Sequence, residues 1–153
     1  MAIERHAHAT WEGDLRSGTG RFDVGSGAIS GQEVTFASRF TPESGGKTSP
    51  EELIAAAHAT CFTMALGSIL AGEQTPPERL AVSAVITLEE VEGTYTITTS
   101  ELEVIGRVAG IDQAGLERAA QEAERVCPVS RALAGSVEIR SHSRLEDSVQ
   151  ASS

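Results

Sequence analysis

Aromatic residues are scarce in this chain of 153 residues, at only 4% of the sequence. A hydrophobic core therefore has to be built mainly from Ala, Val, Ile and Leu. The length is that of one ordinary domain and is sufficient to bury such a core. We expect a single domain over residues 1–145, followed by a small, polar and frayed tail at 146–153.

Basic residues are also few, with 12 Lys and Arg against 22 Asp and Glu, for a net charge of −10. Nucleic-acid binding depends on clustered Lys and Arg that neutralise phosphates, so this balance argues against nucleic acid as a partner. It argues equally against binding to an anionic membrane surface. The charge is typical of a soluble protein that self-repulsion keeps dispersed.

No uninterrupted apolar run approaches the length of about 18 residues that indicates a membrane span. The N-terminal segment MAIERHAHATWEGD lacks the apolar stretch of a signal peptide. We therefore expect a cytoplasmic protein that contacts no membrane. The chain has only two cysteines, and a disulfide in that reducing compartment is more often transient and catalytic than structural.

The first third of the chain has the pattern of short strands. Residues 8–40 have the pattern of several short strands joined by glycine turns, one of them at 25–27. Val34 and Phe36 fall on one side of a strand predicted over 33–40, which places Arg39 at its end. A loop rich in Pro, Gly and Ser follows at 41–50.

The segment SPEELIAAAHATC, residues 49–61, opens the first predicted helix. Ser49 is its expected N-cap, Pro50 its first residue, and Glu52 the partner of Ser49 in a capping box. The helix is predicted to run to about Leu70. One stripe at helical spacing is expected to face the core: Leu53, Ala57, Cys61, Met64, Ala65 and Ser68.

The second half alternates strands and helices. Strands are predicted over 80–91 and 94–108, with a turn at Glu92-Gly93. The apolar register of the second strand switches near Ser100, which indicates a bulge or a change of neighbours. An amphipathic helix over 111–126, capped by Asp112, precedes a short helix over 128–135 and a strand over 136–145. The inner stripe of the 111–126 helix comprises Leu116, Ala119, Ala120 and Ala123. This order of elements indicates an α+β fold.

The two cysteines are the first candidates for chemistry. Cys61 lies on the predicted inner stripe, where a free cysteine is most simply a small buried hydrophobe. Cys127 precedes Pro128 and should cap the next helix, where the positive end of the helix dipole favours a thiolate. A half-buried structural role is the alternative for Cys127.

The charged candidates are weaker on their own. Glu51 and Glu52 complement the dipole at the start of their helix, and Glu51 by spacing alone is a solvated acid. Taken alone, Arg39 is most simply interpreted as a surface arginine. The functional interpretation is that its guanidinium is a fixed cation that lowers the pKa of a nearby thiol.

His58 lies one helical turn before Cys61 and raises two further possibilities. With Cys61 and Cys127 it could form a zinc site, although no CxxC or HxxxH pair supports one. It could also be the base of a Cys-His hydrolase, although no third orienting group is evident.

Taken together, TSPEELIAAAHATCFTMAL (48–66) and CPVSRAL (127–133) resemble the two cysteine motifs of the OsmC/Ohr family of thiol-dependent peroxidases. The N-terminal HATWEGDLRSGTG and the segment ending in SRF are similar to its OsmC branch. The likeness covers roughly residues 6–145. It implies an α+β fold of antiparallel sheets wrapped around two central helices, in an intertwined homodimer with two sites at the subunit interface.

The resemblance also implies roles for individual residues. Cys61 would be the peroxidatic cysteine, which a hydroperoxide oxidises to sulfenic acid. Arg39 would stabilise its thiolate, and Glu51 would hold the guanidinium in a bidentate pair. Cys127 would resolve the sulfenic acid as a disulfide. Arg16 and Arg21 are the alternative positions for the cation.

The implied substrates are organic hydroperoxides or hydrogen peroxide, and the implied activity protects against oxidative stress. A dithiol reductant, in related proteins a lipoylated protein, would complete the cycle without a cofactor or metal. The rival interpretation is a binding or structural protein of the same fold.

Overall fold

In a computed structural model, residues 1–146 are described and the chain forms two compact units, Met1–Leu53 and the part from Ile54 onward. The single domain expected from the chain length stays a prediction. The predicted frayed tail lies outside the described residues except for Glu146. That residue donates its backbone N–H to the carbonyl of Gly106 and pairs with Arg107.

The first unit contains the predicted short strands, in an antiparallel sheet with the order β1-β2-β3. Its strands are β1 (Ala7–Glu12), β2 (Thr19–Val24) and β3 (Gln32–Val34). Gly20 is required opposite Trp11, because a Cβ at Gly20 would lie 2.7 Å from the indole ring. The Trp11 ring therefore packs against the backbone of β2 at Gly20.

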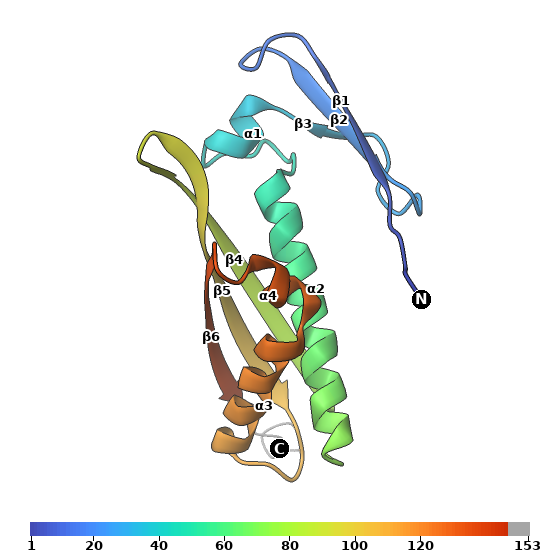
Figure 1. The fold of residues 1–153 in the computed structure, drawn as a ribbon, viewed down its shortest axis with the longest axis vertical. Coiled ribbons are helices and arrows are strands. Elements are labelled where there is room, and N and C mark those ends of the chain that lie inside the picture. Colours follow the sequence, from blue (N-terminus) through green and yellow to red (C-terminus); the bar gives the residue numbers. More distant parts are fainter. Residues whose placement is uncertain (147–153) are drawn as a thin grey trace. The chain divides into compact units, whose positions relative to one another are not determined.

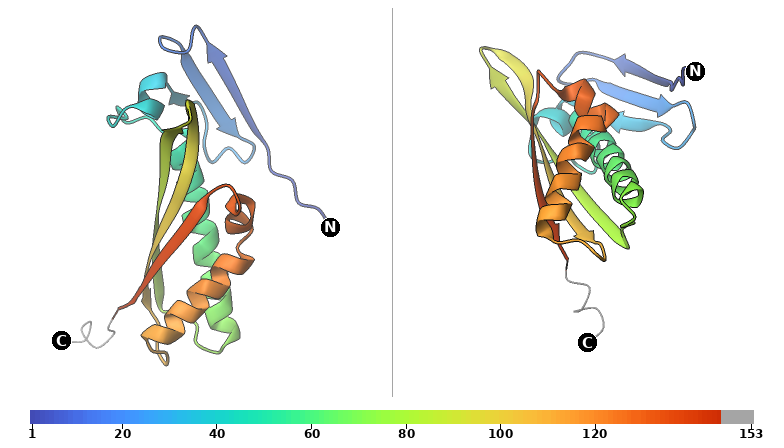
Figure 2. Two further views of the ribbon diagram at one scale, coloured as in Figure 1. Left: turned by 60° about the vertical axis from the view of Figure 1, so that its left-hand side comes forward. Right: turned by 60° about the horizontal axis from the view of Figure 1, so that its bottom comes forward.

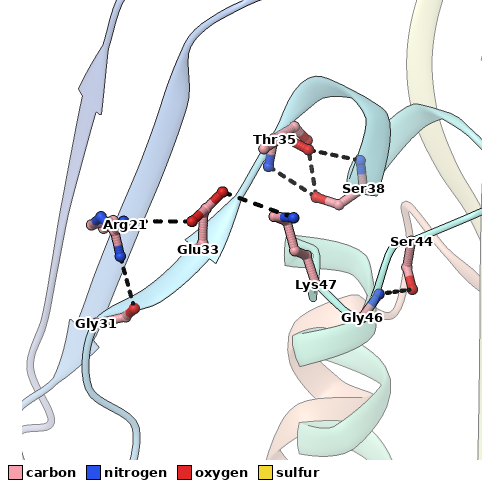
Figure 3. Close-up of polar contacts among 8 residues, drawn as sticks. All are labelled: Arg21, Gly31, Glu33, Thr35, Ser38, Ser44, Gly46 and Lys47. Atoms are coloured by element: carbon pink, nitrogen blue, oxygen red, sulfur yellow. Dashed lines mark hydrogen bonds and ion pairs between the residues drawn. The ribbon is translucent and has the colours of Figure 1, made fainter.

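The strand predicted over 33–40 is wrong from Thr35 onward. β3 ends at Val34, and Phe36–Phe40 form the short helix α1. The reason is a local capping box: Thr35 Oγ1 accepts from the N–H of Ser38, and the Thr35 N–H donates to Ser38 Oγ. Figure 3 shows this pair beside the contacts of Arg21 and Lys47 with Glu33. These backbone bonds override the alternation of Val34 and Phe36.

The long helix α2 (Pro50–Gly72) begins at the predicted cap, with Ser49 Oγ accepting from the N–H of Glu52. The predicted inner stripe is wrong, because Met64 is 71% exposed and Ala57 and Ser68 are also exposed. The residues that are fully buried instead lie four apart: His58, Phe62, Leu66 and Leu70. An alanine-rich helix offers several plausible stripes, and the bulkiest side chains occupy the core.

The second unit is a three-stranded sheet with α2 and α3 (Gln113–Val126) on the same face (Figures 1 and 2). The sheet order is β4-β5-β6, with β4 (Arg79–Val91), β5 (Thr94–Arg107) and β6 (Glu138–Leu145). The core between them joins residues of α2, β5 and α3: Phe62, Leu66, Leu70, Leu102, Val104, Leu116, Ala119, Ala120 and Ala123. Each large side chain in this core contributes about 1.5–3 kcal/mol by its burial.

The expectation of antiparallel sheets holds for β4 and β5 but not for β6, which pairs with β5 in parallel. The physical reason is the connection. The chain leaves β5 at one end and returns through α3 and α4 (Pro128–Leu133), so β6 starts beside Thr99 and runs in the same direction as β5.

The predicted turn and bulge of the β4–β5 hairpin are confirmed. Glu92 and Gly93 both have positive φ, as a tight two-residue hairpin turn requires. The register then shifts so that Thr87 pairs with Thr99 and Leu88 with Ile97, which leaves Thr98 as the extra residue. From this bulge onward Ser100, Leu102 and Val104 face the core.

By length and composition α2 could cross a membrane, with a mean hydropathy of 1.7 over its most apolar window. Its apolar residues do not form an uninterrupted run, because His58 and three hydroxyl residues interrupt them. The same test is passed by core helices of soluble proteins. The packing of Phe62, Leu66 and Leu70 against β5 and α3 is that of a core helix.

Candidate active site

Two elements of the second unit bring the cysteines together. Cys61 lies on α2, and Cys127 lies between α3 and α4, as the C-cap of α3 and the N-cap of α4. Their Sγ atoms share a hydrogen bond of 3.1 Å, and both cysteines are free thiols. Cys127 is fully buried and Cys61 is partly exposed. A small movement would let the two sulfur atoms form a bond.

The position of Cys127 follows from Pro128. Proline disfavours helical geometry in the residue before it, and Cys127 accordingly has φ −62° and ψ 119°. The predicted cap is present: Cys127 Sγ accepts from the N–H of Ser130 at 3.5 Å. Pro128 is the first residue of α4, where its missing N–H costs nothing.

The two thiols differ in acidity. Burial raises the pKa of Cys61, and the contact with Cys127 raises it further, while the backbone at Val129 acts in the opposite direction. Burial also opposes ionisation of Cys127, but hydrogen bonds from Ser130, Cys61 and Val129 outweigh it and lower the pKa of that thiol. Within the second unit, negative charge is therefore more stable on Cys127, and a thiolate at Cys61 needs a cation.

Arg39 and Glu51 form an ion pair within the first unit. Glu51 Oε1 accepts from Arg39 Nε at 3.1 Å and from Nη2 at 2.8 Å, while Oε2 lies 3.3 Å from Nε. Glu51 is only 7% exposed, so it is not the solvated acid that spacing alone indicates. The guanidinium also lies 5.1 Å from the centre of the Phe40 ring. This fork-to-carboxylate geometry fixes the orientation of the arginine.

The alternative arginines have other partners. The Arg16 guanidinium lies over the ring of Phe36, at 4.9 Å from its centre. Arg21 contacts the carbonyl of Gly31 and the carboxylate of Glu33 (Figure 3). Neither is paired with a buried carboxylate as Arg39 is.

An apolar pocket of about 380 Å³ lies within the first unit. Its lining includes both Arg39 and the aromatic residues of β1, β2 and α1: Trp11, Phe22, Phe36 and Phe40. Such a pocket combines a surface suited to a hydrocarbon group with the positive charges of Arg39 and Arg21, which also lines it.

His58 is buried at the centre of the second unit and makes contacts that the sequence did not suggest. Its Nδ1 lies 2.6 Å from Ser100 Oγ, and its Nε2 lies 2.8 Å from Ser130 Oγ. Both ring nitrogens are therefore engaged by hydroxyl groups. This arrangement does not support His58 as a zinc ligand with Cys61 and Cys127, or as the base of a Cys-His hydrolase. Burial also lowers the pKa of His58, which keeps the ring neutral.

Comparison with known proteins agrees with this geometry. The sequence model of the family described as "OsmC-like protein" matches residues 43–142, which include both cysteines, Glu51 and His58. This chain belongs to the OsmC-like family. It is 38% identical over 133 residues to the Peroxiredoxin OsmC of Escherichia coli, covering 87% of this chain and 92% of that protein.

Other OsmC-like relatives extend the comparison. An organic hydroperoxide resistance protein of Xanthomonas axonopodis is 31% identical over 118 residues, covering 73% of this chain and 81% of its own length. The crystal structure of the organic hydroperoxide resistance protein OhrB of Bacillus subtilis has the same α+β fold, with a TM-score of 0.73 and 22% identity. That alignment covers 91% of this chain and 98% of OhrB.

The neutral His58 predicts a loss of stability in acid. Its folded pKa lies below the ordinary value of 6.5, so the unfolded chain takes up the proton first as pH falls. The contribution of His58 to stability is present above about pH 6.5 and is lost as pH falls toward the folded pKa. The free energy of unfolding in urea should therefore fall more for wild type than for His58→Gln as the pH is lowered below that value. His8→Gln, at an exposed position of β1, is the control; an equal change in both variants would contradict this prediction.

Proposed function

We propose that this OsmC-like protein is a cysteine-based peroxidase that reduces hydroperoxides through Cys61 and Cys127. The observation that carries the proposal is the 3.1 Å contact between the two Sγ atoms. The names of its relatives, a peroxiredoxin and an organic hydroperoxide resistance protein, support the same reaction.

The chemistry follows from the residues. The Cys61 thiolate attacks one oxygen of the hydroperoxide, the O–O bond breaks, and the other oxygen leaves as an alcohol after taking up a proton. Cys61 becomes a sulfenic acid. The Cys127 thiolate then attacks the oxidised sulfur, the S–O bond breaks, and water leaves as the disulfide forms. Cys61 is the partly exposed member of the pair and Cys127 the buried one, which suits these two roles.

Arg39 is proposed as the cation that ionises Cys61. The second unit by itself favours the charge on Cys127, so an external positive charge is needed to stabilise a Cys61 thiolate. The same charge would stabilise the oxygen that leaves the peroxide. Glu51 holds the guanidinium in one orientation, and removing either partner would free the other.

The preferred substrate class is an organic hydroperoxide rather than hydrogen peroxide. The pocket beside Arg39 is lined by Trp11, Phe22, Phe36 and Phe40, which offer an apolar surface for a hydrocarbon tail. A dithiol reductant would return the disulfide to two thiols. We place this reaction in the cytoplasm, where such reductants keep thiols reduced.

We also propose a homodimer. α2 carries exposed Met64 and Ala57 on the side that does not face the core of its own unit. An apolar face on a long helix is stable in water when another surface covers it, and a second copy of this helix is a surface of the same composition.

The cysteine roles can be tested by oxidation with one equivalent of cumene hydroperoxide. Reduced wild type should lose both thiols and about two hydrogens of mass, as an intramolecular disulfide requires. Cys61→Ser should consume no peroxide, whereas Cys127→Ser should react once and then stall as a sulfenic acid or over-oxidise. Free-thiol titration and intact mass are the measurements. Normal steady-state turnover by Cys61→Ser would overturn the assignment.

Arg39→Ala is expected to raise the pKa of Cys61, because the thiolate loses its proposed cation. The measurement is the rate of Cys61 alkylation as a function of pH in a Cys127→Ser background. Arg21→Ala is the matched control, since Arg21 also pairs with a glutamate of the first unit. An alkylation profile that shifts in Arg21→Ala and not in Arg39→Ala would move the role to Arg21.

The dimer predicts that a charge at Met64 produces monomers, because an unpaired carboxylate would be buried in the interface. Sedimentation equilibrium of wild type and Met64→Glu measures this. Glu52→Lys, an exposed charge change at the start of the same helix, should leave the mass unchanged. A wild type that sediments as a monomer would refute the dimer.

A further inference from the structure

A continuous chain of hydrogen bonds runs through the second unit from β5 to the two sulfur atoms. It starts at Ser100 on the inner face of β5, passes through both ring nitrogens of His58, and reaches Ser130 on α4. Ser100 and His58 are fully buried, and Ser130 is 1% exposed. Three polar side chains from three separate elements therefore meet where water is excluded.

Ser130 connects this chain to Cys127. Its backbone N–H donates to Cys127 Sγ at 3.5 Å. The Ser130 hydroxyl also contributes to lowering the pKa of Cys127. Ser130 thus acts on the buried sulfur through its N–H, which makes the observed contact, and through its hydroxyl, which is the group that His58 contacts.

The direction of each hydrogen bond can be assigned from the chemistry of the groups. Burial keeps His58 neutral, so only one ring nitrogen carries a hydrogen. For the Ser130 hydroxyl to donate to Cys127, its oxygen must accept from His58 Nε2–H. The other nitrogen, Nδ1, then accepts from the hydroxyl of Ser100. Every donor in this arrangement points towards Cys127, and every buried polar atom has a partner.

We propose that His58 is a positioning residue for the resolving step: through Ser130 it holds a hydrogen-bond donor on Cys127. The inference rests on the proposed peroxidase function, in which the Cys127 thiolate displaces water from oxidised Cys61. A fixed donor keeps Cys127 ionised and in place while that sulfur is inaccessible to solvent. It acts on Cys127 and leaves the first oxidation of Cys61 to other groups.

The simpler interpretation is that His58 only fills and satisfies the core. Two near-isosteric variants separate the two interpretations. In His58→Gln the side-chain amide lies as many bonds from Cα as Nε2 and can reach Ser130. In His58→Asn the amide lies as many bonds from Cα as Nδ1 and is on the side of Ser100. A structural role predicts similar effects of the two variants. A positioning role predicts that Gln preserves the donor to Ser130 and that Asn does not.

The first measurement is the pKa of Cys127 in a Cys61→Ala background, where Cys127 is the only cysteine. Thiolate absorbance in the ultraviolet reports on a buried sulfur without requiring access to a reagent. His58→Asn and Ser130→Ala should each raise the pKa of Cys127 by about one unit, the effect of losing one hydrogen bond. His58→Gln should stay near the value of the parent.

Ser136→Ala is the matched control for Ser130→Ala. Ser136 is exposed, lies just after the same short helix, and bonds only locally to the carbonyl of Leu133. Should His58→Asn fail to fold, the comparison of Ser130→Ala with Ser136→Ala still decides the question. Equal pKa values of Cys127 in these two serine variants, or in the Asn and Gln variants, would overturn the proposal.

The second measurement separates the two steps of the cycle in proteins with both cysteines. After rapid mixing with one equivalent of cumene hydroperoxide, quenched samples give the rates of Cys61 oxidation and disulfide closure by mass. His58→Asn and Ser130→Ala should slow closure by about tenfold, in line with a smaller thiolate fraction, while the first step keeps its rate. If no protein reacts with peroxide, the proposed function fails, and the absorbance titration still tests the role of His58.

Discussion

Pro128 is the constraint on which the thiol pair depends. A proline after Cys127 ends α3, starts α4 and holds Cys127 in an extended conformation between them. An uninterrupted helix would carry residue 127 in a helical conformation, with its side chain on the helix surface. The break instead turns the sulfur toward α2, where it meets Cys61, and presents it with the N–H of Ser130.

A second irregularity, on β5, supplies Ser100, the buried polar group at the other end of the hydrogen-bond chain that leads through His58 to Ser130 and Cys127. The bulge at Thr98 changes which residues of β5 face the core, and Ser100 is the first inward residue after it. A hydroxyl in that position would be costly without a partner. His58 provides that partner and in turn needs Ser130. Two local departures from regular structure are therefore linked through a single imidazole ring.

The sequence predicted elements best where one local interaction dominates. The caps at Ser49 and Asp112, the turn at Glu92-Gly93 and the start of α4 each depend on a few adjacent residues, and the structure has all of them. Arg39 shows the opposite case, because alternation predicted a strand where the cap at Thr35 starts a helix.

The buried face of α2 and the direction of β6 depend on packing between distant segments, so neither could be read from nearby residues. The contacts of His58 were missed for the same reason, since its partners lie 42 and 72 residues away. A signal was available in the i, i+4 spacing of His58 with Phe62, Leu66 and Leu70. The pairing of Arg39 with Glu51 came from family resemblance rather than from residue patterns.

The parallel pairing of β6 has a consequence for how the chain acquires its structure during synthesis. β6 is the last described element, and it covers an edge of β5 that was made some forty residues earlier, with Thr99 opposite Glu138. Until residues 138–145 have left the ribosome, that edge presents unpaired backbone groups on a strand with one apolar face. The chain is thus most prone to aggregate at this point before β6 has been made, and truncation near residue 137 would make that vulnerable state permanent.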